Sequence, residues 1–231
     1  MAKREHAAAV AGNIWKLFII QACRWFLLLM PVLVLFYQEN GLSLQDVFIV
    51  QAFFSVCIII FEVPSGYFSD RLGRRRSLLV GSVAGALGFS SYALAHSLPE
   101  FLFAQFLIAI GASFLSGTDH ALLYDSLIQL GRQGEFQRLV GRYGSIGNFS
   151  EGIAALVGGS MALISLRTPL YCQAVLFLGL IPLAWSLVVR ASREVRHRAE
   201  PKECERPPPC RFHEITAVSK WIRFRGTTRS R

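Results

Sequence analysis

Long apolar stretches alternate with short polar segments over the first 190 residues of the chain. Each stretch holds about 20 residues or more, enough for a helix to cross the roughly 30 Å hydrocarbon core of a bilayer. Helix is the expected form, because lipid demands internal hydrogen bonding and the stretches lack the roughly ten-residue alternating segments of a membrane barrel. The pattern predicts six spans, at residues 14–37, 46–66, 77–95, 100–126, 142–166 and 169–190.

Three of these spans carry residues that disturb a simple apolar helix. Pro31 and Pro182 fall inside the first and last spans, where proline is expected to kink a helix. The fifth span is the weakest of the six, because it contains Asn148 and Glu151.

Small residues recur one turn apart in the third and fifth spans. In lipid, such positions let helix backbones approach closely, since burying Leu against Leu gains little over Leu against a lipid tail. We therefore expect the spans to pack as one compact bundle. The pairs are Gly81 with Gly85, Ala84 with Gly88, Ala154 with Gly158, and Ala155 with Gly159.

Composition supports a lipid environment. Hydrophobic residues make up 53% and charged residues 17% of the 231 positions, and the mean hydropathy is +0.42. A soluble domain has nearer about 25% charged residues. The expected fold is an all-α integral membrane bundle of six transmembrane helices.

Arginine and lysine are distributed unevenly between the two sides of this bundle. Loops rich in these residues stay in the cytoplasm. One side receives most of them and the other side receives only Arg167, so we expect both termini to be cytoplasmic. The predicted organisation is a cytoplasmic segment at 1–13, a transmembrane domain at 14–190 and a cytoplasmic tail at 191–231.

The tail accounts for most of the net charge of +9. It is polar and rich in proline, and we expect it to be disordered or to lie on the membrane, where its "WIRFR" segment contacts anionic lipid headgroups. Nucleic acid is not an expected partner.

Neither the cysteines nor other residue patterns predict a metal, a cofactor or an enzyme. Cys23, Cys57 and Cys172 lie inside apolar spans, and Cys204 and Cys210 lack accompanying histidines at metal-site spacing. The chain has no Gly-x-x-x-x-Gly-Lys-Ser/Thr loop, so ATP is not the expected energy source. No convincing pair of nucleophile and base is present.

A charged segment, "GYFSDRLGRRRS" at residues 66–77, joins the second and third spans. An arginine-rich loop fixes topology, and glycines at 66 and 73 allow a tight reversal. Topology does not explain Asp70, because acidic residues contribute little to it. The spacing of the segment resembles the signature loop of the major facilitator superfamily, and "FEVPSG" and "SGTDHALLYDSL" are similar to a bacterial branch. The matching positions are Gly66, Asp70, Arg71, Gly73, Arg74 and Arg75.

This resemblance, which covers about residues 14–190, implies a secondary transporter in a bacterial inner membrane. It implies a 3+3 inverted repeat and alternating access, with two six-helix halves rocking around a central site. It also implies that Asp70 and Arg74 form a conformational latch, with Asp125 as the best-placed third member. Glu62 and Pro64, in "FEVPSG", are expected to have structural roles.

Four polar residues inside the spans are candidates for the solute or ion pathway: Arg24, Asp119, Glu151 and His120. A charged side chain at mid-depth costs at least roughly 2.5–3.5 kcal/mol, so the charged groups inside the spans should point inward. These groups are Arg24, Glu62, Asp119 and Glu151. Arg24 with Glu151 or Asp119 is expected to bind an anionic substrate, to carry a proton, or to form a fixed internal salt bridge. His120 is a candidate for assisting proton coupling.

Six helices are half of what the superfamily pattern requires. The sequence leaves three alternatives: two copies pair, another chain supplies the second half, or the product is truncated and inactive. The expected function is transport of a small solute, with proton coupling as one candidate mechanism. The competing hypothesis is a membrane protein that binds or regulates partners without transporting anything.

Overall fold

The computed structural model describes residues 2–187, with side chains from residue 10 onward. The tail predicted at 191–231 lies outside the described residues. The domain boundaries after residues 13 and 190 therefore stay predictions.

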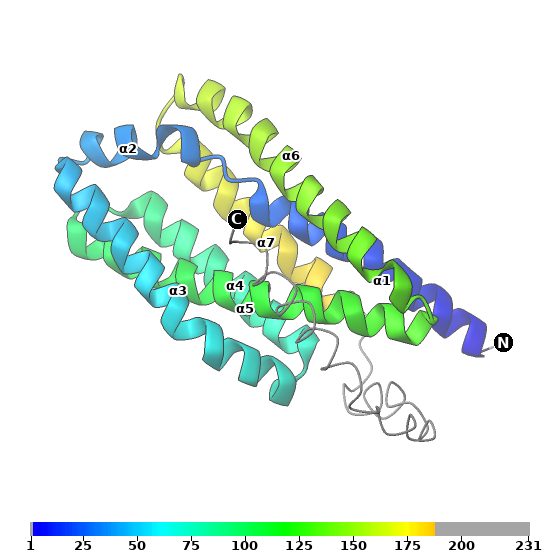
Figure 1. The fold of residues 1–231 in the computed structure, drawn as a ribbon. Coiled ribbons are helices and arrows are strands. Elements are labelled where there is room, and N and C mark those ends of the chain that lie inside the picture. Colours follow the sequence, from blue (N-terminus) through cyan, green and yellow to red (C-terminus); the bar gives the residue numbers. More distant parts are fainter. Residues whose placement is uncertain (1, 188–231) are drawn as a thin grey trace, which may run out of the picture. The chain divides into compact units, whose positions relative to one another are not determined.

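Helices form all of the regular structure in residues 2–187 (Figure 1), which confirms the all-α fold. Each predicted span corresponds to helix, and several helices continue beyond the span boundaries. The elements are α1 (Ala2–Trp25), η1 (Met30–Val32), α2 (Leu33–Glu39), α3 (Leu44–Leu72), α4 (Arg74–Leu94), α5 (Leu98–Leu130), η2 (Gln133–Glu135), α6 (Phe136–Ala162) and α7 (Thr168–Trp185).

Five segments of residues 2–187 are long and apolar enough to cross a membrane. They are Val10–Glu39, Leu44–Leu72, Arg74–Leu94, Leu98–Leu130 and Thr168–Trp185. Helix α6 has 27 residues and reaches about 40 Å, but it is not among the five. Its polar and small residues lower its hydropathy, in agreement with the weakness expected for span 142–166.

The first span is broken, whereas the sequence predicts only a kink at Pro31. Helix α1 ends at Trp25, and Pro31 lies in the short 3-10 helix η1 that precedes α2. A side chain of the bundle supplies a hydrogen-bond partner at this break: the Leu28 backbone amide donates to Gln173 Oε1 of α7 at 3.1 Å. A Cβ at Gly158 of α6 would overlap the Leu28 carbonyl. Irregular backbone at membrane depth is tolerated where it is packed in this way.

The helices run in alternating directions, so the connections gather at two ends of the bundle (Figure 1). We call the end with the α3–α4 and α5–α6 connections the loop end. Helix α5 packs along α3 and α4, α4 also packs against α7, and α1 contacts α5 and α6.

Close approach of α4 and α5 depends on glycine. A Cβ at Gly111 of α5 would lie 2.7 Å from the amide nitrogen of Gly85 and 2.9 Å from the carbonyl oxygen of Gly81. These α4 glycines are thus packing positions, as the sequence predicts. Gly158 is another, but Gly159 faces open space, so the expectation for Gly159 is wrong.

An aromatic cluster and one arginine stabilise the end of the bundle opposite the loop end. Phe36, Tyr37 and Phe101 are fully buried. Arg167 donates to the Ala93 carbonyl at 2.6 Å and to Asn40 Oδ1 at 2.7 Å. These bonds tie the ends of α2 and α4 to the start of α7.

Candidate functional site

The α3–α4 turn is a single residue, Gly73. Its φ of 93° and ψ of 143° suit glycine, and α4 begins at the next residue. Gly66 was expected to contribute to the reversal, but it lies inside α3, which continues to Leu72. A Cβ added at Gly66 would meet nothing within 4 Å, whereas a Cβ added at Gly117 of α5 would lie 4.0 Å from the Gly66 Cα.

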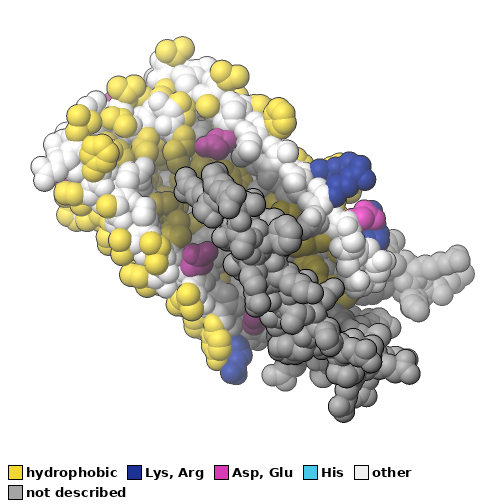
Figure 2. All heavy atoms as spheres, in the orientation of Figure 1, with side chains coloured by type: hydrophobic (Ala, Val, Ile, Leu, Met, Phe, Trp, Pro, Cys, Tyr) yellow, Lys and Arg dark blue, Asp and Glu magenta, His cyan; other side chains and the backbone are white. Residues whose placement is uncertain are grey.

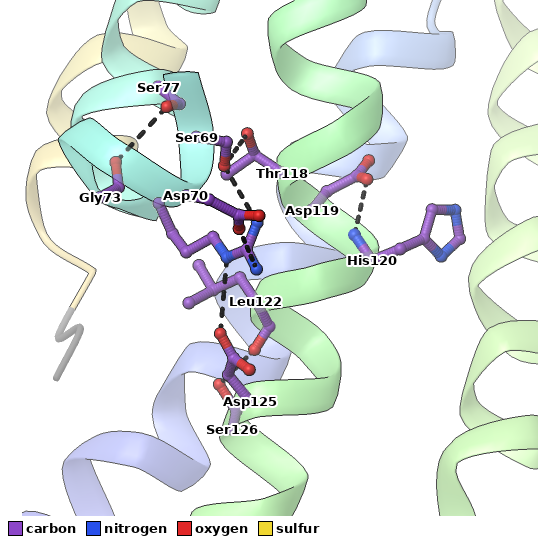
Figure 3. A network of polar contacts seen from close by, with 11 residues as sticks. Ser69, Asp70, Gly73, Ser77, Thr118, Asp119, His120, Leu122, Asp125 and Ser126 are labelled. Atoms are coloured by element: carbon purple, nitrogen blue, oxygen red, sulfur yellow. Dashed lines mark hydrogen bonds and ion pairs between the residues drawn. The ribbon is translucent and has the colours of Figure 1, made fainter. Parts of the chain in front are cut away.

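Arg74 is the centre of a polar cluster at this turn. Its guanidinium lies 3.0 Å from Asp70 Oδ1 and 3.5 Å from Asp125 Oδ2, and it donates to Ser69 Oγ at 3.1 Å. Figure 3 shows these acceptors converging from α3 and α5. The Arg74 side chain is 9% exposed, so its charge depends on these partners. The structure thus brings together the three residues that the resemblance assigns to the latch.

The cluster extends into α5 through a residue that the sequence did not single out. Thr118 Oγ1 donates to Ser69 Oγ at 3.0 Å, and both residues are fully buried. We call Ser69, Asp70, Arg74, Thr118 and Asp125 the loop-end cluster. It joins α3, the first residue of α4, and α5.

The other charged residues of the signature segment lie outside this cluster. The Arg71 guanidinium carbon lies 5.1 Å from the centroid of the Tyr67 ring. The Arg75 guanidinium carbon lies 4.6 Å from the centroid of the Trp185 ring of α7. Such cation–π contacts hold a guanidinium at the protein surface.

Glu62 and Pro64 lie within α3 and do not interrupt it. The Glu62 side chain is exposed, and the Glu62 backbone carbonyl accepts from Ser65 Oγ at 3.0 Å. The expected structural role of Glu62 through its carboxylate is therefore not visible in residues 2–187. Pro64 removes one backbone donor, and the Ser65 hydroxyl also donates to the Ser113 carbonyl of α5 at 3.1 Å.

A second polar site lies between α1, α5 and α6. Arg24 Nη1 is 2.8 Å from Asp119 Oδ2, and the two side chains are 18% and 1% exposed. Tyr143 of α6 donates to the same oxygen at 3.0 Å, and the His120 amide donates to Oδ1 at 2.7 Å. The Asp119 carboxylate therefore has donors on both oxygens, which is what a charge at this depth requires.

Glu151 and His120 have different surroundings from those expected. Within residues 2–187 Glu151 makes no ion pair or hydrogen bond, so the partner of Arg24 is Asp119. The side chain of His120 is exposed, and its ring lies 5.3 Å from that of Tyr143. Figure 3 shows it pointing away from Asp70 and Asp125.

Arg24 also lines a cavity of about 460 Å³ that is partly open to the surroundings of the bundle. The walls come from the α1–α2 break and from α3, α4, α5 and α7, and they are mostly apolar. Gln173 lines this cavity as well, and its Nε2 has no hydrogen-bond partner although the residue is fully buried. A cavity of this size is typical of small-molecule sites.

Comparison with known proteins agrees with this geometry. The family model of the Major Facilitator Superfamily matches residues 17–227, which include every site residue described above and continue beyond residue 187. A search of curated proteins gave no match. Together with the bundle of membrane-spanning helices, the match means that the chain belongs to the Major Facilitator Superfamily, a family of secondary transporters that carry small solutes.

Proposed function

We propose that the described bundle is one six-helix half of a transporter and that it works by alternating access against a second six-helix half. The observation that carries this proposal is the position of two acids. Glu62 is exposed on α3, and Glu151 has no ion pair or hydrogen bond within residues 2–187. Figure 2 shows acidic side chains among hydrophobic ones on one face of the bundle. Facing lipid, each charge would cost roughly 2.5–3.5 kcal/mol, so a protein or water-filled partner face is favoured.

The loop-end cluster supplies a latch between such halves. Arg74 is held in place by its burial and by Asp125, whereas the Asp70 side chain is 49% exposed. Asp70 is therefore accessible to a helix end of a second half, whose amide groups stabilise a carboxylate. Separation of the halves would break such contacts, and their formation would favour one conformation.

The Arg24–Asp119 pair lies at the cavity and is the best candidate for the translocation pathway. A proton delivered to Asp119 would release Arg24, which links ion movement to a change in the cavity wall. The arginine-rich loop end would face the cytoplasm of a bacterial inner membrane, as the distribution of positive charge predicts.

The test is oligomeric mass in a mild detergent, followed by solute uptake into proteoliposomes. We expect an assembly larger than the monomer, and uptake that depends on it. A strict monomer without uptake would contradict the proposal and support the alternative of a non-transporting membrane protein.

A further inference from the structure

We propose that the groove between the loop-end parts of α1 and α6 binds one anionic phospholipid, with its phosphate on Arg142 and an acyl chain along the apolar wall. The two helices lie side by side toward the loop end (Figure 1). The groove has a volume of about 730 Å³ and is open to the surroundings of the bundle. It is separate from the cavity that Arg24 lines, because no described residue lines both.

Two arginines supply the charge at this groove. Of the described residues that line it, only Arg132 and Arg142 are charged. Arg132 is balanced by Glu135, whose carboxylate accepts two of its hydrogen bonds at 2.7 Å. Arg142 is exposed and has no ion pair or hydrogen bond within the described residues. The groove therefore keeps an excess of one positive charge, which one phosphodiester would neutralise.

The electrostatic field around Arg142 favours an anion. The Arg132 hydrogen bonds lower the pKa of Glu135, and the positive charges of Arg138 and Arg142 lower it further. Basic residues near the membrane surface attract anionic headgroups. The paired donors of a guanidinium also match the geometry of phosphate oxygens, so an arginine is well suited to this contact.

The wall beyond Arg142 is apolar and aromatic. Phe149 lies two turns after Arg142, about 10 Å further along α6. Trp15 and Phe18 of α1 line the same groove, and their ring centroids are 6.3 Å apart. Tryptophan is enriched where headgroups meet hydrocarbon. A phosphate on Arg142 would thus place an acyl chain beside Phe149, which is how a phospholipid is oriented in a leaflet.

The two sides of α6 indicate that lipid, and not a second protein half, covers the groove. Phe149, Ile153 and Leu156 are exposed on the groove side and continue it as an apolar surface. Glu151 lies on the opposite side of α6 from Phe149, because two residues of helix turn by about 200°. The second half is proposed to cover Glu151, so the groove side is left to the bilayer. An opening toward the bilayer is what a lipid site requires.

The binding assay is quenching of Trp15 by phospholipids that carry bromine on their acyl chains. The full chain has 4 tryptophans, and replacing those at 25, 185 and 221 by Phe leaves Trp15 as the reporter. Brominated phosphatidylglycerol in phosphatidylcholine vesicles is compared with brominated phosphatidylcholine in phosphatidylglycerol vesicles. We expect about fivefold preference for phosphatidylglycerol at Trp15, the value for one basic residue near a membrane surface.

Variants separate a local contact from general attraction. Arg142→Gln should remove the preference. Arg76→Gln, at an exposed arginine of α4 near the same end, removes the same charge outside the groove and should keep it. Gly12→Leu should lower the preference by filling the groove, since a Cβ at Gly12 meets open space. Gly179→Leu, also facing open space but on α7, is its control.

A chain without preference for phosphatidylglycerol would overturn the proposal, as would equal effects of the Arg142 and Arg76 variants. Absence of quenching by either lipid would show that protein covers the groove, and would overturn it too. Glycerol 3-phosphate in the aqueous phase should leave the quenching unchanged. If it relieves the quenching, the site binds a free phosphate and the lipid assignment is wrong.

A second measurement covers failure of the single-tryptophan chain to fold. Phosphatidylglycerol added in detergent should raise the melting temperature of the chain with all tryptophans more than phosphatidylcholine does, and Arg142→Gln should remove the difference. An equal rise with both lipids would contradict the site. Lipid preference without solute uptake would leave the site intact and contradict the transport function alone.

Discussion

Thr118 and Asp119 are consecutive in α5, yet their side chains bind to different helices. Thr118 donates to Ser69 of α3 in the loop-end cluster, while Asp119 pairs with Arg24 of α1 at the cavity. One turn of α5 thus belongs to both sites. A small rotation or shift of α5 at this level would alter both sets of contacts, which gives a physical route for coupling the loop-end cluster to the Arg24–Asp119 pair.

Arg74→Ala should destabilise the bundle by about 3 kcal/mol, because it removes a buried cation that lies 3.5 Å from the partly buried Asp125 carboxylate. The measurement is thermal unfolding in detergent. Arg132→Ala is the control, since the ion pair of Arg132 with Glu135 is solvent-exposed and its loss should change the melting temperature little.

The double variant Arg74→Ala with Asp125→Ala separates the free energy of the ion pair from the packing energy of each side chain. If the ion pair matters, the double variant loses less stability than the sum of the two single variants. Strict additivity would contradict an energetic link between the two residues.

Asp70→Asn should reduce uptake while leaving insertion and stability nearly unchanged. The side chain of Asp70 is half exposed, so its pairing with Arg74 contributes less than about 1 kcal/mol. Uptake is measured at matched protein levels in proteoliposomes. Full uptake in the Asn variant of an active assembly would remove the latch role.

Arg24→Ala should cost about 3–5 kcal/mol of stability and abolish uptake, because Asp119 is 1% exposed and loses its cation. Replacing both residues, as Arg24→Met with Asp119→Leu, should recover most of the stability, since apolar groups of similar volume replace a buried pair at little cost. Recovery of uptake as well would show that the pair is only structural.

Gly158→Ala and Gly159→Ala should have effects of opposite sign. A Cβ at 158 would overlap the Leu28 backbone and should destabilise the bundle by about 1–3 kcal/mol. A Cβ at 159 meets open space, so the better helix propensity of Ala should stabilise the bundle by up to about 1 kcal/mol. Thermal unfolding of the two variants checks both signs, and a stable Gly158→Ala protein would mean that the α1–α2 break is not held by α6.

Hydropathy sufficed to predict the five spans that are long and apolar enough to cross a membrane, because lipid leaves helix as the only form for a long apolar stretch. It did not predict the break after Trp25. That break depends on two residues more than 100 positions away. Gln173 of α7 accepts a hydrogen bond from the Leu28 amide, and Gly158 of α6 leaves room for the Leu28 carbonyl. No local pattern encodes such a relation.

The charged site residues were predicted more completely than their uncharged partners. Asp70 and Arg74 follow from the signature spacing, and Asp125 follows from its place near the end of the fourth span. Ser69 and Tyr143 are ordinary residues of a helix until the fold places them. The structure was also needed to choose between Asp119 and Glu151 as the partner of Arg24. The sequence places both acids inside predicted spans and does not distinguish them.

Gly73 is the whole connection between α3 and α4. With one linking residue the adjoining ends of the two helices cannot separate, and each helix packs along α5. Any displacement of the loop end would therefore move the joined ends of both helices together against α5.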